Sequence, residues 1–211
     1  MEENFTLKND ILCIAYFMKK NGWEGISKTN FHRVLYFAAV LSTVFLKDYE
    51  WTYSFSNTIF GPRNKDITGE LDELFMKGFL MLSNRKVISN RVEEKYVISD
   101  AGCEALEKTC FILDSEKSKL LWLEIIVNVL SVYGESFLSK LIKEDPNVSS
   151  MNSLHQNGNI PCTNTDENLT IELYKYLKKS GKDRLNLESS LDEEYLMLFF
   201  DLLYRKYKED K

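Results

Sequence analysis

Histidine is scarce in this sequence, with only His32 and His155 among its 211 residues. His32 lies in an apolar helical stretch, where a buried structural histidine is more common than a catalytic base. His155 lies in a polar segment that has no neighbouring acidic residue or cysteine to orient it. The sequence also lacks a glycine-rich phosphate loop, a GxSxG pattern and an HExxH pattern. We therefore expect a protein without catalytic activity and without a cofactor.

Closely spaced metal ligands are also missing. The four cysteines, at positions 13, 103, 110 and 162, have no CxxC spacing and no histidine nearby in the sequence, which argues against a structural zinc site. Acidic runs such as Asp72-Glu73 and Asp192–Glu194 could be taken for metal ligands. They are also typical of solvent-facing helix surfaces and of helix N-termini, which favour negative charge. We expect no bound metal.

Long apolar runs and an excess of basic residues are absent as well. The longest apolar run, residues 120–134, is short for a bilayer and is interrupted by Glu124 and Asn128. The first ten residues are acidic and polar, unlike a signal or transit peptide. The formal net charge of −5 argues against a protein that coats nucleic acid non-specifically. We expect a cytoplasmic protein that has no membrane partner.

The hydrophobic pattern predicts a mainly α-helical, α+β protein. Helices are expected over 7–20 and 28–46, a short strand over 48–57, a helix over 64–77, a β-hairpin over 79–99 and a helix over 100–112. Asn21-Gly22 should end the first helix, Ser27 or Thr29 should start the second, and Ser99 should cap the last. This order is that of a winged-helix domain, with the hairpin as its wing, and we assign it to residues 1–112.

The remaining residues predict a helical C-terminal half. Residues 113–146 should form a long helix followed by a short one. Residues 147–165 are rich in Asn, Ser, Gly and Pro and lack a periodic apolar pattern, which predicts a flexible polar loop. Residues 166–211 should form a C-terminal helical segment.

The charges on the winged helix favour a protein partner over DNA. The helix over 64–77, which would read DNA, carries two lysines against four carboxylates: Lys65 and Lys77 against Asp66, Glu70, Asp72 and Glu73. Carboxylates directed at a phosphate backbone meet charge of the same sign. The hairpin, in contrast, has four cations that are candidate contacts to a DNA backbone: Arg85, Lys86, Arg91 and Lys95. The alternative is that these are ordinary charges on a solvated hairpin.

The C-terminal helix is apolar on two adjoining faces, which is more than docking on its own domain requires. Two aromatic-rich faces suit a helix that lies between its own domain and another chain. The alternative is that both faces are buried within the chain's own helical half. The residues predicted for a partner interface are Trp122, Leu191, Tyr195, Phe199, Phe200, Leu203 and Tyr204.

Four segments together resemble a known family. They are KTNFHRVLYFAAVL (28–41), FGPRNKDITGELDELFMKGFL (60–80), KYVISDAG (95–102) and VYGESFLSKLIKEDP (132–146). They are similar to the small winged-helix middle component of bacterial ABC-three-component systems, including the small subunit of Lamassu-type antiphage defence. The resemblance spans most of residues 7–146.

The resemblance implies a non-catalytic subunit that binds an SMC-like ATPase with a long coiled coil. Such a subunit would help to hold an effector, such as a nuclease, inactive and would contact DNA at most through its wing. Two alternatives remain. One is a free-standing winged-helix transcriptional regulator or antitoxin, which would need a basic recognition helix or a homodimer on a palindromic site. The other is an enzyme of unrecognised type, which would need a pocket where His32 or clustered carboxylates meet.

Overall fold

The computed structural model describes residues 2–46, 49, 51–88, 91–109, 117–162, 167–185 and 192–209. These residues are mostly helical, with a small antiparallel sheet, so the predicted α+β class is confirmed. The helices are α1 (Glu2–Lys20), α2 (Lys28–Val40), α3 (Ser42–Phe45), α4 (Ile67–Met76), α5 (Asp100–Lys108), α6 (Lys117–Ser131), α7 (Glu135–Glu144), α8 (Pro146–Ser153), α9 (Leu169–Leu185) and α10 (Asp192–Glu209). The strands are β1 (Ile26–Ser27), β2 (Phe55–Ser56), β3 (Leu80–Ile88), β4 (Arg91–Ile98) and β5 (Asn159–Ile160).

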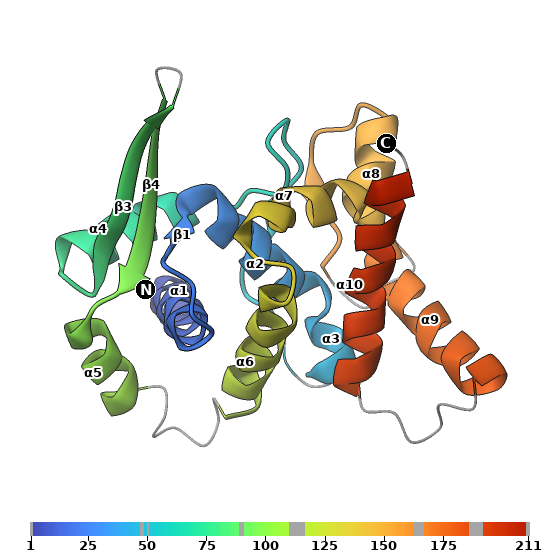
Figure 1. The fold of residues 1–211 in the computed structure, drawn as a ribbon, viewed down its shortest axis with the longest axis horizontal. Helices are drawn as coiled ribbons and strands as arrows, with labels where there is room; N and C mark the ends of the chain where they lie inside the picture. Colours follow the sequence, from blue (N-terminus) through green and yellow to red (C-terminus); the bar gives the residue numbers. More distant parts are fainter. Residues whose placement is uncertain are drawn as a thin grey trace.

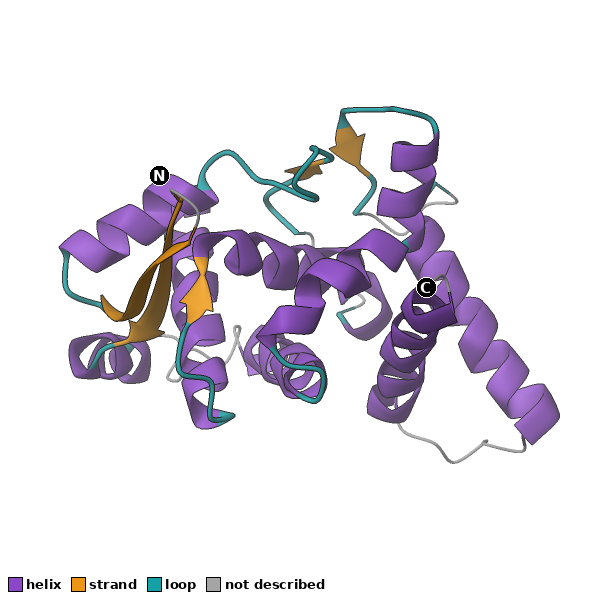
Figure 2. Cartoon of the chain, turned by 45° about the horizontal axis from the view of Figure 1, so that its top comes forward, coloured by secondary structure: helices purple, strands orange, loops and turns teal. Residues whose placement is uncertain are grey.

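The larger sheet has the antiparallel order β1-β4-β3. Ile26 is opposite Tyr96, and Leu80 is opposite Ile98, with a register irregularity between Leu82 and Asn84. The hairpin β3–β4 projects beyond the helices on the side of the N-terminus (Figure 1). The short β2–β5 pair is separate from this sheet and lies above the helices in Figure 2.

Local sequence signals define several helix ends as expected. Gly22, with φ of 78°, follows α1 in the left-handed conformation that glycine adopts without strain. The Ser27 hydroxyl accepts a hydrogen bond from the Asn30 N–H (3.3 Å) and caps α2. The Ser99 hydroxyl does the same for α5 through the Gly102 N–H (3.1 Å).

Helix α2 is the centre of the core. From Asn30 to Val40 every residue except Arg33 is buried, as its apolar pattern on all sides predicted. Helices α1, α4, α6 and α7 pack against it, so the N-terminal and C-terminal parts of the chain share one hydrophobic core. The core is therefore not divided at residue 112.

The structure corrects the prediction of a flexible loop over 147–165. Residues 146–153 form helix α8, because Pro146 occupies its first turn and the Asp145 carboxylate accepts a hydrogen bond from the Val148 N–H (3.1 Å). Strand β5 then pairs with β2, which places Ile160 opposite Phe55. Residues 163–165 of the predicted loop lie outside the described part of the chain.

Two other predicted elements are shorter in the structure. In the described part of the strand expected over 48–57, only β2 is a strand. Helix α5 ends at Lys108 with Thr109 as its C-cap, and residues 110–112 of the helix expected to reach 112 lie outside the described residues. Among the described residues, no single helix is long and apolar enough to cross a membrane.

A buried ion pair joins α1 to α6. The Lys119 Nζ lies 2.6 Å from an Asp10 carboxylate oxygen, and the two side chains are only 4% and 3% exposed. The Tyr53 hydroxyl donates to the other Asp10 oxygen (3.0 Å). Burial lowers the pKa of Lys119, but its interactions with Asp10 and Tyr49 more than compensate, so that the pKa is raised and the ammonium stays charged.

Replacing one member of this pair should be strongly destabilising. We expect Lys119→Met to lower the free energy of unfolding by about 3 to 5 kcal/mol, because it leaves the Asp10 carboxylate buried without its cation. The double variant Asp10→Asn/Lys119→Met should recover part of this loss. Urea unfolding measures all three. Lys108→Met, at an exposed surface pair, is the matched control and should change stability by at most about 0.5 kcal/mol. Equal effects of the two lysine variants would contradict the prediction.

Candidate functional site

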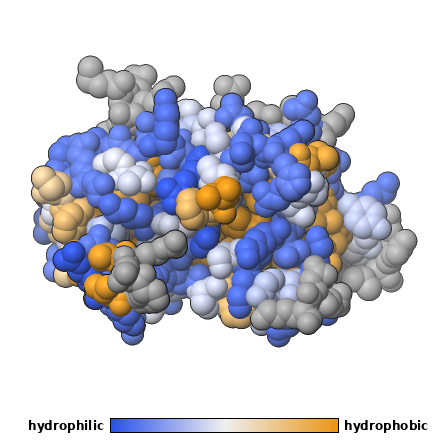
Figure 3. All heavy atoms as spheres, turned by 90° about the horizontal axis from the view of Figure 1, so that it is seen from above, coloured by the Kyte–Doolittle hydropathy of each residue, from blue (hydrophilic) through white to orange (hydrophobic). Residues whose placement is uncertain are grey.

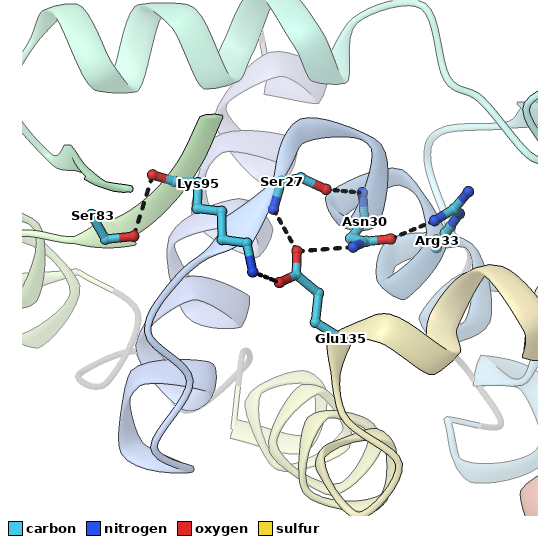
Figure 4. Close-up of polar contacts among 6 residues, drawn as sticks. All are labelled: Ser27, Asn30, Arg33, Ser83, Lys95 and Glu135. Atoms are coloured by element: carbon cyan, nitrogen blue, oxygen red, sulfur yellow. Dashed lines mark hydrogen bonds and ion pairs between the residues drawn. The ribbon is translucent and has the colours of Figure 1, made fainter. Parts of the chain in front are cut away.

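The carboxylate of Glu135, the first residue of α7, connects three elements of the chain. One oxygen accepts hydrogen bonds from the Ser27 N–H (3.0 Å) and from the Asn30 amide (2.9 Å), at the start of α2. The other oxygen forms an ion pair with Lys95 of β4. Figure 4 shows these groups converging on the carboxylate from the hairpin and from α2. The Glu135 side chain is only 14% exposed, so these contacts are largely shielded from water.

Asn30 extends this cluster to Arg33. Its amide nitrogen donates to Glu135, while its oxygen accepts a hydrogen bond from the Arg33 Nη1 (2.6 Å) (Figure 4). A single buried amide side chain thus orients both a carboxylate and a guanidinium. This orientation holds Arg33 on the side of α2 that faces the segment before α4.

His32 joins the same segment to α2. Its Nδ1 accepts the backbone N–H of Asn64 (3.2 Å), which leaves Nε2 as the protonated nitrogen that donates to the Thr68 hydroxyl (3.2 Å). Burial, reinforced by the charges of Arg63 and Arg33, lowers the pKa of His32 to about 4. The ring is therefore neutral at pH 7, and both of its nitrogens are occupied by structural hydrogen bonds.

The carboxylates of α4 are bound by lysines from elsewhere in the chain. Lys8 of α1 lies 3.1 Å from Glu70 and 2.8 Å from Glu73, and Lys28 at the start of α2 pairs with Asp72. Hydrogen bonds from Lys77 and Lys8 lower the pKa of Glu73 to about 2. The acidic residues that we read as a sign against DNA binding thus also attach α4 to α1 and α2. The sequence pattern did not reveal these lysine partners, which are far away along the chain.

The hairpin cations are not equally available to a DNA backbone. Lys95 is held by Glu135 at the base of the hairpin, and the Arg85 Nε lies 3.4 Å from a Glu94 oxygen. Lys86 is exposed and stands opposite Glu93 in the strand register. The side chain of Arg91 lies outside the described part of the structure. Arg85 and Lys86 are therefore the described hairpin cations that still face solvent.

The structure corrects the predicted partner interface on α10. Helix α10 packs against α6, α7 and α9, and this packing covers both of its aromatic faces. Phe200, for example, meets Phe37 of α2 edge-on at 5.0 Å between ring centroids. Five of the predicted interface side chains are at most 1% exposed: Trp122, Tyr195, Phe199, Phe200 and Leu203.

Of the other two predicted interface residues, the structure describes only Tyr204. Tyr204 is partly buried against Phe137, with 5.0 Å between ring centroids, and Leu191 lies outside the described residues. The alternative prediction, burial of both faces within the chain, therefore agrees with the structure. The outer side of α10 keeps a smaller apolar stripe, in which Met197, Leu198 and Leu202 are 42%, 37% and 38% exposed.

A buried polar network, which the sequence did not predict, joins α2 to α8 and α9. The Asp145 carboxylate is fully buried and accepts hydrogen bonds from the hydroxyls of Tyr36 (2.6 Å) and Thr170 (2.7 Å). The Asn147 amide continues the network to Asn168 (3.0 Å). Each of these polar groups has a hydrogen-bond partner within the network, so we interpret the network as one that holds α2, α8 and α9 together.

A cavity of about 250 Å³ lies beside α8, and its lining includes neither His32 nor the carboxylates of α4. The described residues include no group of three or more His, Cys, Asp or Glu side chains that could hold a metal ion. Hydrophobic side chains reach the face shown in Figure 3 in separate patches among hydrophilic ones.

No protein-family model, curated protein or solved structure matches this chain.

Replacing Glu135 should loosen the contact between α7, α2 and the hairpin. We expect Glu135→Gln to lower the free energy of unfolding by about 1.5 to 3 kcal/mol, because the variant loses the ion pair with Lys95 and weakens two shielded hydrogen bonds. Chemical denaturation measures the change. Glu104→Gln, at an exposed pair on α5, is the control and should alter stability by about 0.5 kcal/mol or less. A Glu135 effect no larger than the control would show that the cluster is not a structural connection.

His32 should make stability depend on pH between about 6.5 and 4. The unfolded chain binds a proton at the usual histidine pKa of 6.5, whereas the folded chain resists protonation down to about 4. Stability from this group is therefore complete above pH 6.5 and is lost as the pH falls to about 4. The loss should be on the order of 3 kcal/mol.

Urea unfolding across this pH range should show a steeper loss for the wild-type protein than for His32→Gln. NMR titration of the folded wild-type protein gives the pKa of His32 directly. A value near 6.5 would contradict the prediction.

Proposed function

We propose that this chain is a non-catalytic accessory subunit of an SMC-like ATPase complex of the Lamassu, or ABC-three-component, type of antiphage defence. In this proposal residues 1–112 are a winged helix that binds protein, and the subunit works in the cytoplasm. It scaffolds or regulates a coiled-coil ATPase and an effector such as a nuclease. The basis is the resemblance of its sequence segments together with the arrangement of the N-terminal elements.

The topology supports the winged-helix part of the proposal. The chain order α1, β1, α2, α4, β3, β4 and the sheet order β1-β4-β3 are those expected of a winged helix with one hairpin wing. Helix α4 then occupies the position of the recognition helix. The segment 41–66 is an insertion between α2 and α4, and it carries strand β2 to its pairing with β5.

The observation that carries the protein-binding proposal is the charge that α4 presents to solvent. Asp72 and Glu73 remain 52% and 40% exposed although they pair with lysines, so a DNA phosphate approaching this helix would meet carboxylates. A protein surface has no such requirement for cations. Any contact with the phosphate backbone of DNA is then made by the solvent-exposed cations of the hairpin, Arg85 and Lys86.

The exposed stripe of α10 replaces the buried aromatic residues as the proposed site of ATPase contact. Leu198 and Leu202 are one helical turn apart, so they lie on the same side of α10, with Met197 beside them. Apolar side chains grouped on one helix face suit a helix or coiled-coil partner.

The test is purification of the tagged chain from its native host, with identification of the proteins that accompany it. We expect a large coiled-coil ATPase to co-purify with the wild-type chain and to be lost with Leu198→Asp/Leu202→Asp. Leu154→Asp, at an exposed leucine that ends α8, is the matched control and should retain the ATPase. Urea unfolding should show that both variants are folded.

A titration with DNA at several salt concentrations completes the experiment. A folded homodimer that binds a specific operator without any other protein would overturn the proposal in favour of a transcriptional regulator or antitoxin.

A further inference from the structure

Two arginines lie next to the contact between α2 and the segment before α4: Arg33 follows His32, and Arg63 precedes Asn64, whose backbone N–H donates to His32 (3.2 Å). Arg33 belongs to α2, and Arg63 lies in the segment between β2 and α4. Burial and the neighbouring charge of Arg63 lower the pKa of Arg33. Both side chains are half-buried, so they are partly shielded from the water that would screen their mutual repulsion.

Within the described chain, neither guanidinium forms an ion pair. Arg33 donates to the neutral oxygen of Asn30, and the Arg63 guanidinium lies 5.4 Å from the ring centroid of Phe60. The Nε of each arginine is buried without a hydrogen-bond partner. Buried donors that no protein atom satisfies call for an explanation, and a bound ion is one of the usual ones.

The two arginines are held in place by their surroundings. The backbone of Arg63 forms an antiparallel bridge with Ser56, through hydrogen bonds of 2.8 and 2.9 Å. Arg33 is oriented by Asn30, which is itself held by Glu135. The hydrogen bond from the Asn64 N–H to His32 fixes the two supporting segments side by side.

The nearby Glu135 carboxylate raises the pKa of Arg33 but forms no ion pair with either arginine. Glu135 is already engaged by Lys95, by the Ser27 N–H and by the Asn30 amide. The neighbouring His32 contributes no charge because its ring is neutral. The arginine pair is therefore a concentrated positive charge on a fixed platform.

We propose that Arg33 and Arg63 form a binding site for a phosphate-class oxyanion. A guanidinium offers a planar fork of N–H donors that matches the oxygens of phosphate, and charge-assisted hydrogen bonds of this kind are strong. Two guanidiniums match the charge and the several oxygens of a phosphate better than those of a single carboxylate. The phosphate could be free, as in pyrophosphate or a nucleotide, or part of a nucleic-acid backbone. This inference does not depend on the proposed function.

Thermal unfolding of the full chain gives the first test. Sodium phosphate or pyrophosphate should raise the melting temperature above its value in sodium chloride of equal ionic strength, because a ligand that binds only the folded state stabilises it. This extra shift should disappear in Arg33→Gln and in Arg63→Gln. Arg63→Lys keeps the positive charge but loses the planar set of guanidinium donors, so it should retain only part of the increase in melting temperature.

Titration calorimetry distinguishes the two sources of phosphate. Pyrophosphate and a short random-sequence DNA duplex are titrated separately into the wild-type chain and the variants. Each glutamine variant should weaken binding of the true ligand by about tenfold or more, in line with the loss of one charge-assisted interaction. Arg205→Gln, at an exposed arginine of α10, is the matched control and should leave the binding of pyrophosphate and of the duplex unchanged.

Each outcome bears on the proposal. Pyrophosphate binding that depends on both arginines supports the site with a free phosphate as ligand. Duplex binding with the same dependence, without pyrophosphate binding, supports it with a nucleic-acid backbone as ligand. The absence of both, or binding that Arg33→Gln and Arg63→Gln leave unchanged, would overturn the proposal.

Discussion

The rest of the structure depends on the near-complete burial of α2. A helix that is apolar on almost every side must be surrounded, and here α1, α4, α6 and α7 surround it. The polar side chains of α2, such as Asn30, His32 and Tyr36, are therefore buried as well. Each buried donor or acceptor needs a partner, because an unsatisfied one costs about 1 to 3 kcal/mol. The partners of α2 therefore decide where the other elements are attached.

Three polar side chains of α2 make these attachments to distant parts of the chain. Asn30 binds Glu135 of α7, His32 binds the segment at Asn64, and Tyr36 binds Asp145 before α8. Each bond joins residues separated by more than thirty positions in the sequence. The C-terminal half is thus attached to the N-terminal half by polar contacts as well as by the common core. Buried residues of both halves accordingly belong to one hydrophobic cluster.

What the sequence predicts well is local. Ser27, Ser99 and Gly22 specify helix ends through their own backbone neighbours, and the burial of α2 follows from its own composition. The aromatic faces of α10 could not be assigned in this way, because an apolar face has the same pattern whether its own chain or a partner covers it. The prediction of a loop over 147–165 was wrong for a related reason. Strand β5 is only two residues long, and it forms by pairing with β2, which lies about a hundred positions earlier in the sequence.

The net charge of a sequence segment is likewise a poor guide to the charge of the surface it forms, because residues far away in the sequence pair with its charged side chains. The carboxylates of α4 are met by Lys8 and Lys28, and Lys95 of the hairpin is met by Glu135. Arg33 and Arg63 belong to separate segments, and the hydrogen bond between Asn64 and His32 brings these segments together; within the described chain neither arginine forms an ion pair with a carboxylate. Positive charge that is only partly compensated therefore gathers beside α2, at a place where two separate segments meet. Since an anion is attracted to what remains after compensation, this position is a stronger candidate for anion binding than the base of the hairpin.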